Sequence, residues 1–404
     1  MLFELAEGAL RFLVPINLDA NGLGPQSIGF VMFAFSFTSL LARGAAATLF
    51  RPDRARRLVV GAGLASSFAY LLTPFVDHGA AFTVLMAIDG FGWGLATTCL
   101  LAMVMLCTPV SLTPAVAMGW YIGFQGVAFA LATTVGGVLA EVAGVQPAML
   151  LLATLPGLAA ALIALRMPPV VRADATPAIL EQRPAGHRNG LRRRLAGVGL
   201  LPLAVWTAAI VAVYLNVMNG LLQAFFPLLG LAAGLTVAQI GTLSSVRSGI
   251  SAVARFGAGW LFARIPARRL HLPLLTLSAG TLALLPSAGA YLVHLPLFAA
   301  NGVSRGLLRV TTSAAAMEET GPRQAGTAAA VMTAGLDVGK MIGPLVGGVV
   351  ATAVGLDAMF RIVPLSFLAV YLVLFLLRPR RRGHRTSTAP AAGDAEPITI
   401  DPAP

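Results

Sequence analysis

Residues 42–57, with the sequence ARGAAATLFRPDRARR, end a long apolar segment with a group of arginines. The stretch returns 212 residues later as ARFGAGWLFARIPARR, residues 254–269, and the two align without a gap. From Glu7 to Leu58 this offset gives 19 identities in 52 aligned positions, whereas chance at this composition gives about 10%. The chain is therefore built from two copies of one unit.

The composition places both copies in a membrane. Hydrophobic residues make up 57% of the 404 residues and charged residues only 11%, against about 25% charged residues in soluble domains. Apolar segments of about 20 residues, long enough to cross a ~30 Å hydrocarbon core, recur along the whole length. We predict twelve membrane-spanning helices, six in each copy: 1–18, 26–50, 58–75, 82–106, 115–140, 147–165, 200–230, 240–263, 271–290, 294–316, 325–350 and 357–377.

The predicted fold class is an all-α membrane protein of two six-helix bundles related by a parallel internal repeat. The bundles cover residues 1–165 and 200–377. A Pro- and Arg-rich cytosolic linker at 166–199 joins them, and a disordered cytosolic tail follows at 378–404. The repeat places the start of the first helix about ten residues before Met1. Either the first helix is short or the true start of the chain lies upstream of Met1, and the second alternative is slightly favoured.

The arginines predict the orientation in the membrane. Lysine occurs once, at Lys340, so 27 of the 28 basic residues are arginines. Twenty of them lie in the linker, in the tail and in the loops after the second, eighth and tenth helices, all on one side. By the positive-inside rule both termini are cytosolic, and we expect a multi-pass protein of the plasma (inner) membrane. The net charge of +12 is then a topology signal, and no nucleic-acid partner is expected.

Several short patterns resemble those of the major facilitator superfamily of secondary carriers. The loop after the second helix resembles the signature R-P-x-x-G-x-L-x-D-R-x-G-R-R of that family, although Arg51 stands at its acid and Asp53 lies two residues late. The matching positions are Arg43, Leu49, Arg56 and Arg57 in the first copy and Arg255, Gly259, Leu261, Arg268 and Arg269 in the second. Gly343-Pro344 and Gly347-Gly348 resemble the Gly-Pro-x-x-Gly-Gly pattern of the family. The resemblance implies a twelve-helix carrier in which the duplicated basic stretch, Asp53 included, forms a gate.

Charges inside the predicted spans are costly and need a partner, water or a function. The third, sixth and ninth spans contain none. The interior charges are Glu4, Glu7, Arg11, Arg43, Asp89, Arg247, Arg255, Arg305, Arg309, Asp337 and Lys340. The resemblance implies that the spans that carry these charges line a central cavity, so we expect a hydrated path for a solute.

The first copy carries acids where the second carries amides. Glu4, Glu7 and Asp89 correspond to Asn216, Asn219 and Asn301, and Arg11 corresponds to Gln223. This asymmetry favours a carrier in which one half handles protons and the other hydrogen-bonds the solute. The proton-coupling candidates are Glu4, Glu7, Asp89 and Asp337. The substrate-cavity candidates are Arg11, Asn216, Asn219, Gln223, Asn301, Arg305 and Lys340. A structural alternative stands beside two of these roles, namely permanent Glu7–Arg11 and Asp337–Lys340 ion pairs.

The predicted function is alternating-access transport of a small organic solute, coupled to protons and directed to export. The alternatives are a proton-coupled importer of a small organic acid and, in another class, a non-transporting receptor or an intramembrane enzyme. The sequence contains no G-x-x-x-x-G-K-[ST] or H-E-x-x-H pattern, and its G-x-S-x-G match at 302–306 lies inside a predicted span, so ATP, a metal, a cofactor and catalytic residues are not expected. The expected partners are the solute, protons and the lipid bilayer, and the expected state is a monomer.

Overall fold

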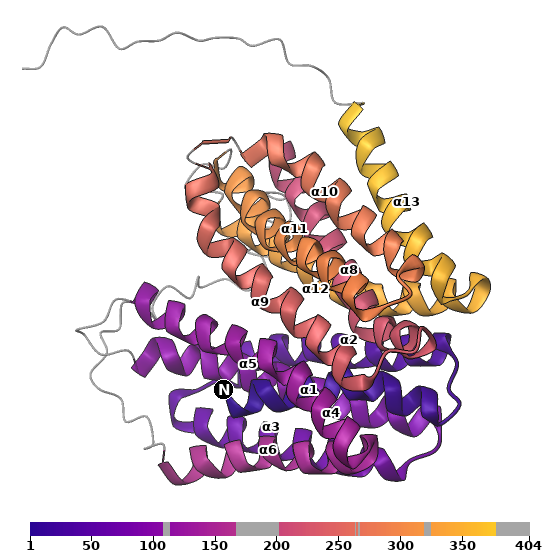
Figure 1. Ribbon diagram of the computed structural model, residues 1–404. Helices are drawn as coiled ribbons and strands as arrows, with labels where there is room; N and C mark the ends of the chain where they lie inside the picture. The colour runs from indigo at the N-terminus through magenta and orange to yellow at the C-terminus, as the bar shows by residue number, and fades with distance from the viewer. Residues whose placement is uncertain (108–113, 167–201, 263, 266, 319–324, 377–404) are drawn as a thin grey trace, which may run out of the picture. The chain divides into compact units, whose positions relative to one another are not determined.

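The structure is a computed structural model that describes residues 1–107, 114–166, 202–262, 264–265, 267–318 and 325–376. These residues form twelve α-helices (Figure 1). Those of the first copy are α1 (Leu2–Ala20), α2 (Pro25–Leu49), α3 (Pro52–Leu72), α4 (Gly79–Cys107), α5 (Pro114–Ala143) and α6 (Val145–Arg166). Those of the second are α8 (Leu203–Ala232), α9 (Val237–Phe262), α10 (Ala267–Leu284), α11 (Tyr291–Glu318), α12 (Ala325–Val354) and α13 (Leu356–Leu376). Residues 1–368 form one compact unit, to which the contacts described below belong.

Composition explains which helices are exposed to lipid and which carry charge. Within the described ranges, nine helices are long and apolar enough to cross a membrane. The remaining three are α1, α9 and α11, and each of them carries charged residues along its length. Large apolar side chains such as Phe68, Leu151 and Leu292 are exposed on helix surfaces, which suits contact with lipid better than contact with water.

Glycines let the helices inside each half approach backbone to backbone. On α12, glycines recur every fourth residue along the face that meets α8. They are Gly335, Gly339, Gly343 and Gly347, and the first three lie against the backbone carbonyls of Ala209, Val213 and Val217. The glycines of the Gly-Pro-x-x-Gly-Gly pattern therefore include members of a helix-packing stripe.

The repeat is visible in how helices cross. In the first half α4 crosses α2 at Gly90, where an added Cβ would overlap the carbonyl oxygen of Phe35. In the second half α11 crosses α9 at the equivalent Gly302, where an added Cβ would lie 2.6 Å from the carbonyl oxygen of Arg247. Phe35 and Arg247 are themselves equivalent at the offset of 212, so the same crossing is built twice.

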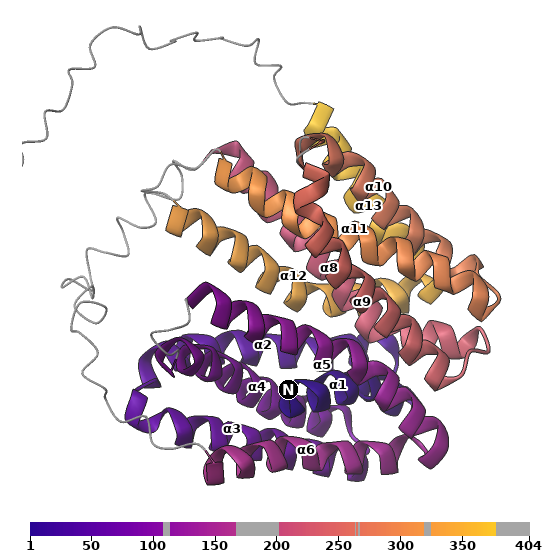
Figure 2. The same cartoon turned by 60° about the vertical axis from the view of Figure 1, so that its left-hand side comes forward.

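Two helix pairs join the halves, α2 with α12 and α5 with α9 (Figure 2). Near the beginning of α2, Gly29 packs on the backbone of Pro344 and Gly348 of α12. At the equivalent place on α9, Gly241 packs on the backbone carbonyl of Thr133 of α5. Both contacts lie toward the ends of α2 and α9 that follow the α1 and α8 turns, the side that the arginine distribution predicts to be extracytosolic.

Most helices begin within three residues of their predicted starts, but two begin four or more residues earlier. α3 starts at Pro52 rather than at 58, and α10 starts at Ala267 rather than at 271. Proline fits the first turn of a helix because its missing N–H needs no partner there, and Asp53 in the same turn complements the helix dipole. The gate residues assigned to loops, namely Asp53, Arg56, Arg57, Arg268 and Arg269, therefore lie in the first turns of helices.

The predicted linker beyond Arg166 and the tail lie outside the described residues. The limits of the two bundles therefore stay predictions.

Candidate functional site

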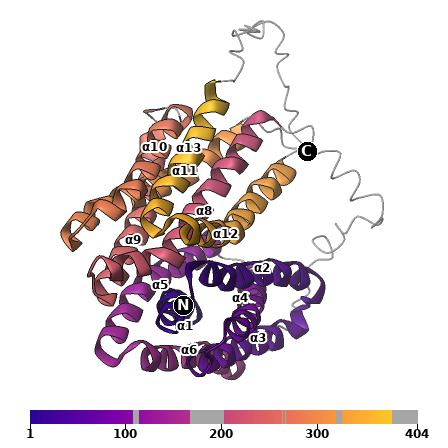
Figure 3. The same cartoon turned by 90° about the vertical axis from the view of Figure 1, so that its right-hand side faces the viewer.

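The first half buries a group of charges around α1. Glu4, Glu7 and Arg11 lie three and four residues apart, so they share one face of the helix, and all three side chains are buried. Arg11 Nε lies 3.6 Å from Glu7 Oε1. α1 packs between α5 and α6 (Figure 3), and the Nε2 of Gln125 on α5 donates to Glu4 Oε1 at 2.5 Å.

Two further groups complete this buried acidic site. The hydroxyl of Tyr70, on α3, donates to Glu7 Oε2 at 3.2 Å. Asp89, on α4, is fully buried and forms no ion pair among the described residues, and the hydroxyls of Tyr70 and Ser66 lie beside its carboxyl group. The sequence did not indicate Tyr70 as a site residue, because the candidates were charged residues and the third span contains none. A buried tyrosine in an otherwise apolar membrane helix was the available signal.

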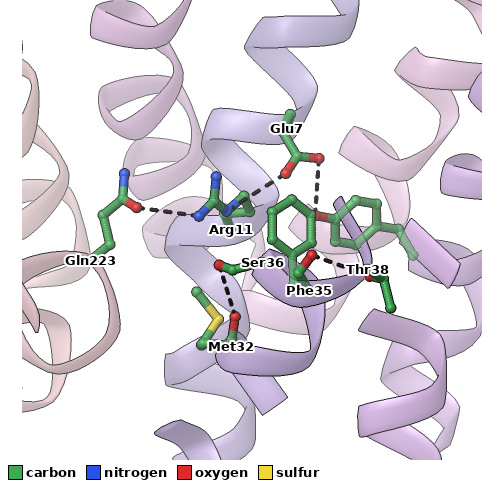
Figure 4. A network of polar contacts seen from close by, with 8 residues as sticks. Glu7, Arg11, Met32, Phe35, Ser36, Thr38 and Gln223 are labelled. Carbon is green, nitrogen blue, oxygen red and sulfur yellow. Dashed lines mark hydrogen bonds and ion pairs between the residues drawn. The ribbon is translucent and has the colours of Figure 1, made fainter. Parts of the chain in front are cut away.

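Arg11 also reaches the second half. Its Nη2 donates to Gln223 Oε1, on α8, at 3.3 Å (Figure 4). The guanidinium stands 4.4 Å from the centroid of the Phe35 ring on α2. Arg11 is therefore held between Glu7 on its own helix and Gln223 in the other half.

In the second half, neutral amides surround a buried arginine, Arg247. Arg247 donates through Nε to Asn301 Oδ1 at 3.0 Å and through Nη2 to Asn219 Oδ1 at 2.8 Å. These asparagines stand where the first half has Asp89 and Glu7. Two of the predicted cavity residues are thus brought together by an arginine that was not among them. Asn216 on α8 and Arg305 on α11 are half-buried.

The charges of α12 face the first half. Arg43 Nη1 on α2 lies 2.5 Å from Asp337 Oδ1, which makes an ion pair between the halves. The ammonium of Lys340 lies 4.3 Å from the centroid of the Trp93 ring, and the guanidinium of Arg43 lies 5.7 Å from the same ring. The indole ring of Trp93 therefore contacts two cations, Arg43 of the first half and Lys340 of the second. Asp337 pairs with Arg43 and not, as one alternative held, with Lys340.

The other predicted gate residues do not gather at one place. Arg56 donates to the carbonyl of Ala164 on α6, and Arg255 donates to Ser251 Oγ at 3.3 Å. Asp53 lies 3.9 Å from its neighbour Arg54, and both are exposed. Of the remainder, Arg57, Arg269 and Gly259 are exposed, and the side chain of Arg268 lies outside what the structure describes.

A small cavity lies in the second half, between α8, α11 and α12. Its volume is about 210 Å³, and it is lined by Ala212, Leu215, Arg309, Thr312, Ser313, Met332, Thr333 and Leu336. Pockets for drug-sized ligands measure roughly 300–1,000 Å³, so this space suits a small solute. Its lining combines apolar side chains with one guanidinium and three hydroxyls.

Twelve helices in two related halves, with charges buried where the halves meet, define a multi-pass membrane transporter. The sequence matches the Major Facilitator Superfamily over residues 1–336 and 217–400, and the chain belongs to that family. The predicted fold class, an all-α membrane protein of two repeated six-helix bundles, is confirmed. The protein is a secondary transporter of a small solute and not an enzyme.

Solved structures of low sequence identity share the fold. The crystal structure of the nucleoside transporter NupG has a TM-score of 0.70 at 11% identity, covering 93% of this chain and 98% of that chain. A bacterial homolog to the human lysosomal transporter Spinster, in an inward-facing and occupied conformation, has a TM-score of 0.68 at 13% identity, covering 93% and 94%. No curated protein matches the sequence.

Proposed function

We propose that the transporter couples the movement of its solute to protons, and that Glu7 and Asp89 carry them. The burial of Asp89 is the observation that supports this most directly. An ionised carboxylate in that position would lose its hydration and gain no ion pair, only the neutral hydroxyls of Tyr70 and Ser66, which leaves a cost of several kcal/mol. A bound proton removes this cost, so burial favours the neutral form of Asp89.

Glu7 supplies the second proton site. It lies within electrostatic range of Asp89, and two buried carboxylates that close together repel each other when both are ionised. Unlike Asp89, Glu7 has an ion-pair partner for its charged form, namely Arg11, beside the Tyr70 hydroxyl. The pair therefore suits one negative charge and one proton, which is the arrangement that a proton carrier needs.

Arg11 provides the link between proton binding and the two halves. It contacts Glu7 and Gln223 at the same time. When Glu7 binds a proton, Arg11 loses its ion pair and keeps its partner in the second half. The strength of this contact between the halves then depends on the protonation of Glu7, which is the coupling that alternating access requires.

Export by exchange with protons is the proposed direction. Uptake of a small organic acid together with protons is the second candidate, because the second half carries arginines that suit an anionic group. We also propose that the protein is a monomer in the plasma (inner) membrane with both termini in the cytosol, on the basis of the arginine-rich segments on one side.

Liposomes that contain the reconstituted protein and an internal pH dye test the coupling and its direction. Solute added outside acidifies the lumen if protons move with it, and makes the lumen alkaline if they are exchanged. Glu7→Gln and Asp89→Asn abolish the dye response, whereas Asp19→Asn, which changes an exposed acid on the same helix, keeps it. Solute flux in both buried-acid variants with a dye response equal to that of the wild type would sink the proposal.

A further inference from the structure

The second half of the chain concentrates positive charge that no carboxylate neutralises. Arg247 and Arg255 lie on α9, and Arg305 and Arg309 lie on α11, which packs against α9. Arg305 is within electrostatic range of the other three. In the part of the chain that the structure describes, none of these four residues forms an ion pair. They are termed the arginine cluster below.

The repeat shows that this charge is not a requirement of the fold. The positions of the first half that correspond to the arginine cluster are Phe35, Arg43, Trp93 and Thr97. Of these only Arg43 is charged, and its charge is paired with Asp337. The same helix crossing is therefore built in the first half without a surplus of cations, so the surplus needs an explanation of its own.

The arginine cluster has more N–H donors than the hydrogen bonds described here use. Arg247 donates hydrogen bonds to two amide oxygens, which supply no negative charge. Arg255 bonds one serine hydroxyl, and its Nε is buried without a partner among the described residues. Guanidinium groups close together in a membrane interior repel one another and are costly to keep there unless an anion joins them.

The arginine cluster opens onto the small cavity of the second half. Arg309 lines this cavity beside the hydroxyls of Thr312, Ser313 and Thr333. Arg305 lies one turn earlier on α11 and on the same helix face, because residues four apart are neighbours. Arg309 is exposed and lines the cavity, whereas Arg305 is half-buried, so a solute that enters the cavity meets Arg309 first.

We propose that the arginine cluster binds the anionic group of the transported solute, and that this solute is a small organic carboxylate or phosphate. The inference rests on the proposed function, since it names the solute class of the same transporter. The planar fork of a guanidinium matches either group with two parallel hydrogen bonds. Arg305 and Arg309 contact the anion, the hydroxyls of the cavity accept or donate at its polar remainder, and Arg247 and Arg255 add to the positive potential.

Binding to the purified protein, at fixed pH and without a gradient, tests this. The probes are succinate and glycerol 3-phosphate, with the neutral succinamide and glycerol as isosteres, and the readouts are calorimetric binding and the unfolding temperature. At least one of the two anions binds and raises the unfolding temperature, while the neutral probes do neither. Succinate alone points to a carboxylate, and glycerol 3-phosphate alone points to a phosphate ester.

Variants locate the binding. Arg305→Gln and Arg309→Gln each weaken anion binding about tenfold or more, because each removes a charge-assisted hydrogen bond. The control Arg361→Gln, which changes an exposed arginine that bonds Ser287 on the same half, binds as the wild type does. Arg305→Met raises the unfolding temperature of the ligand-free protein, because it relieves repulsion, and cancels the further rise that the anion causes.

Three results would overturn the inference: binding of neither anion, equal binding of an anion and its neutral isostere, and unchanged anion binding in both glutamine variants. A lower unfolding temperature for ligand-free Arg305→Met would also count against it, since the arginine would then be structural. The binding assay uses no gradient, so a failure of proton coupling with intact anion binding would contradict the proposed function alone.

Discussion

Arg11 and Gln223 occupy the same position in the two copies of the repeat, and they contact each other, with Arg11 Nη2 3.3 Å from Gln223 Oε1. Two points related by a two-fold rotation meet only near its axis. The contact therefore marks the axis that relates the halves, between α1 and α8, which pack against each other. The contact joins the two halves directly, so it is suited to respond when the halves rock against each other.

Gln223→Ala tests the contact at the axis. The variant leaves Arg11 with one partner fewer, and a hydrogen bond to a charged group contributes about 1.5–3 kcal/mol when buried. We expect a lower unfolding temperature and a smaller proton movement per transported solute. Gln146→Ala, which removes an exposed glutamine of α6, serves as the control. Equal stability and equal coupling in the two variants would show that the contact has no role.

Tyr70→Phe tests the phenol beside Glu7. The hydroxyl donates to the charged form of Glu7, so its loss disfavours that form. Transport is then expected to reach half its maximal rate at a higher pH than in the wild type, with little change in expression. The rate is measured from pH 5 to pH 9 in liposomes. An unchanged midpoint would place Tyr70 outside the proton site.

Asp337→Asn tests the ion pair between the halves. The pair is partly exposed, with side-chain exposures of 32% for Arg43 and 18% for Asp337, so its contribution to stability is modest, about 1 kcal/mol. We expect a clear loss of transport with a small change in the unfolding temperature, because the pair joins α2 to α12. The exchanged double variant Arg43→Asp, Asp337→Arg should recover part of the flux. No recovery, or full flux in the single variant, would contradict this role.

Gly302→Ala tests the duplicated helix crossing. The new Cβ would lie 2.6 Å from the carbonyl oxygen of Arg247, and such overpacking costs typically 1–3 kcal/mol. Gly280→Ala on α10 is the matched control, since no atom lies within 4 Å of its Cβ and alanine is the better helix former. Thermal unfolding in detergent should show a loss for the first variant and none for the second. Similar temperatures for both would mean that α9 and α11 separate easily.

Much of the fold follows from the sequence because its cause is local or repeated. The lengths of the apolar segments predict where the helices lie, and the 212-residue offset predicts which positions of the two halves are equivalent. The acid-to-amide differences at Glu7 and Asp89 point to residues that the structure buries in one half and bonds to Arg247 in the other. The early start of α3 was not predicted because its first residues were assigned to the loop that resembles the family signature, although proline is favoured in a first turn.

Contacts between the halves were beyond the reach of the sequence. Asp337 has a cation one turn away at Lys340, and only the packing of α12 on α2 gives it Arg43 instead. The rotation of α9 about its axis likewise decides that Arg247 meets Asn219 and Asn301. Such pairings depend on three-dimensional arrangement and on the conformational state, which periodicity does not contain.

The main-chain contacts of Gly29 with Pro344 and of Gly241 with Thr133 have a consequence for the history of the protein. At these two places the halves meet through backbone atoms of both helices. Substitutions of cavity side chains leave these contacts in place. Specificity is therefore free to diverge among descendants of the duplicated unit while the contacts between the halves are inherited unchanged.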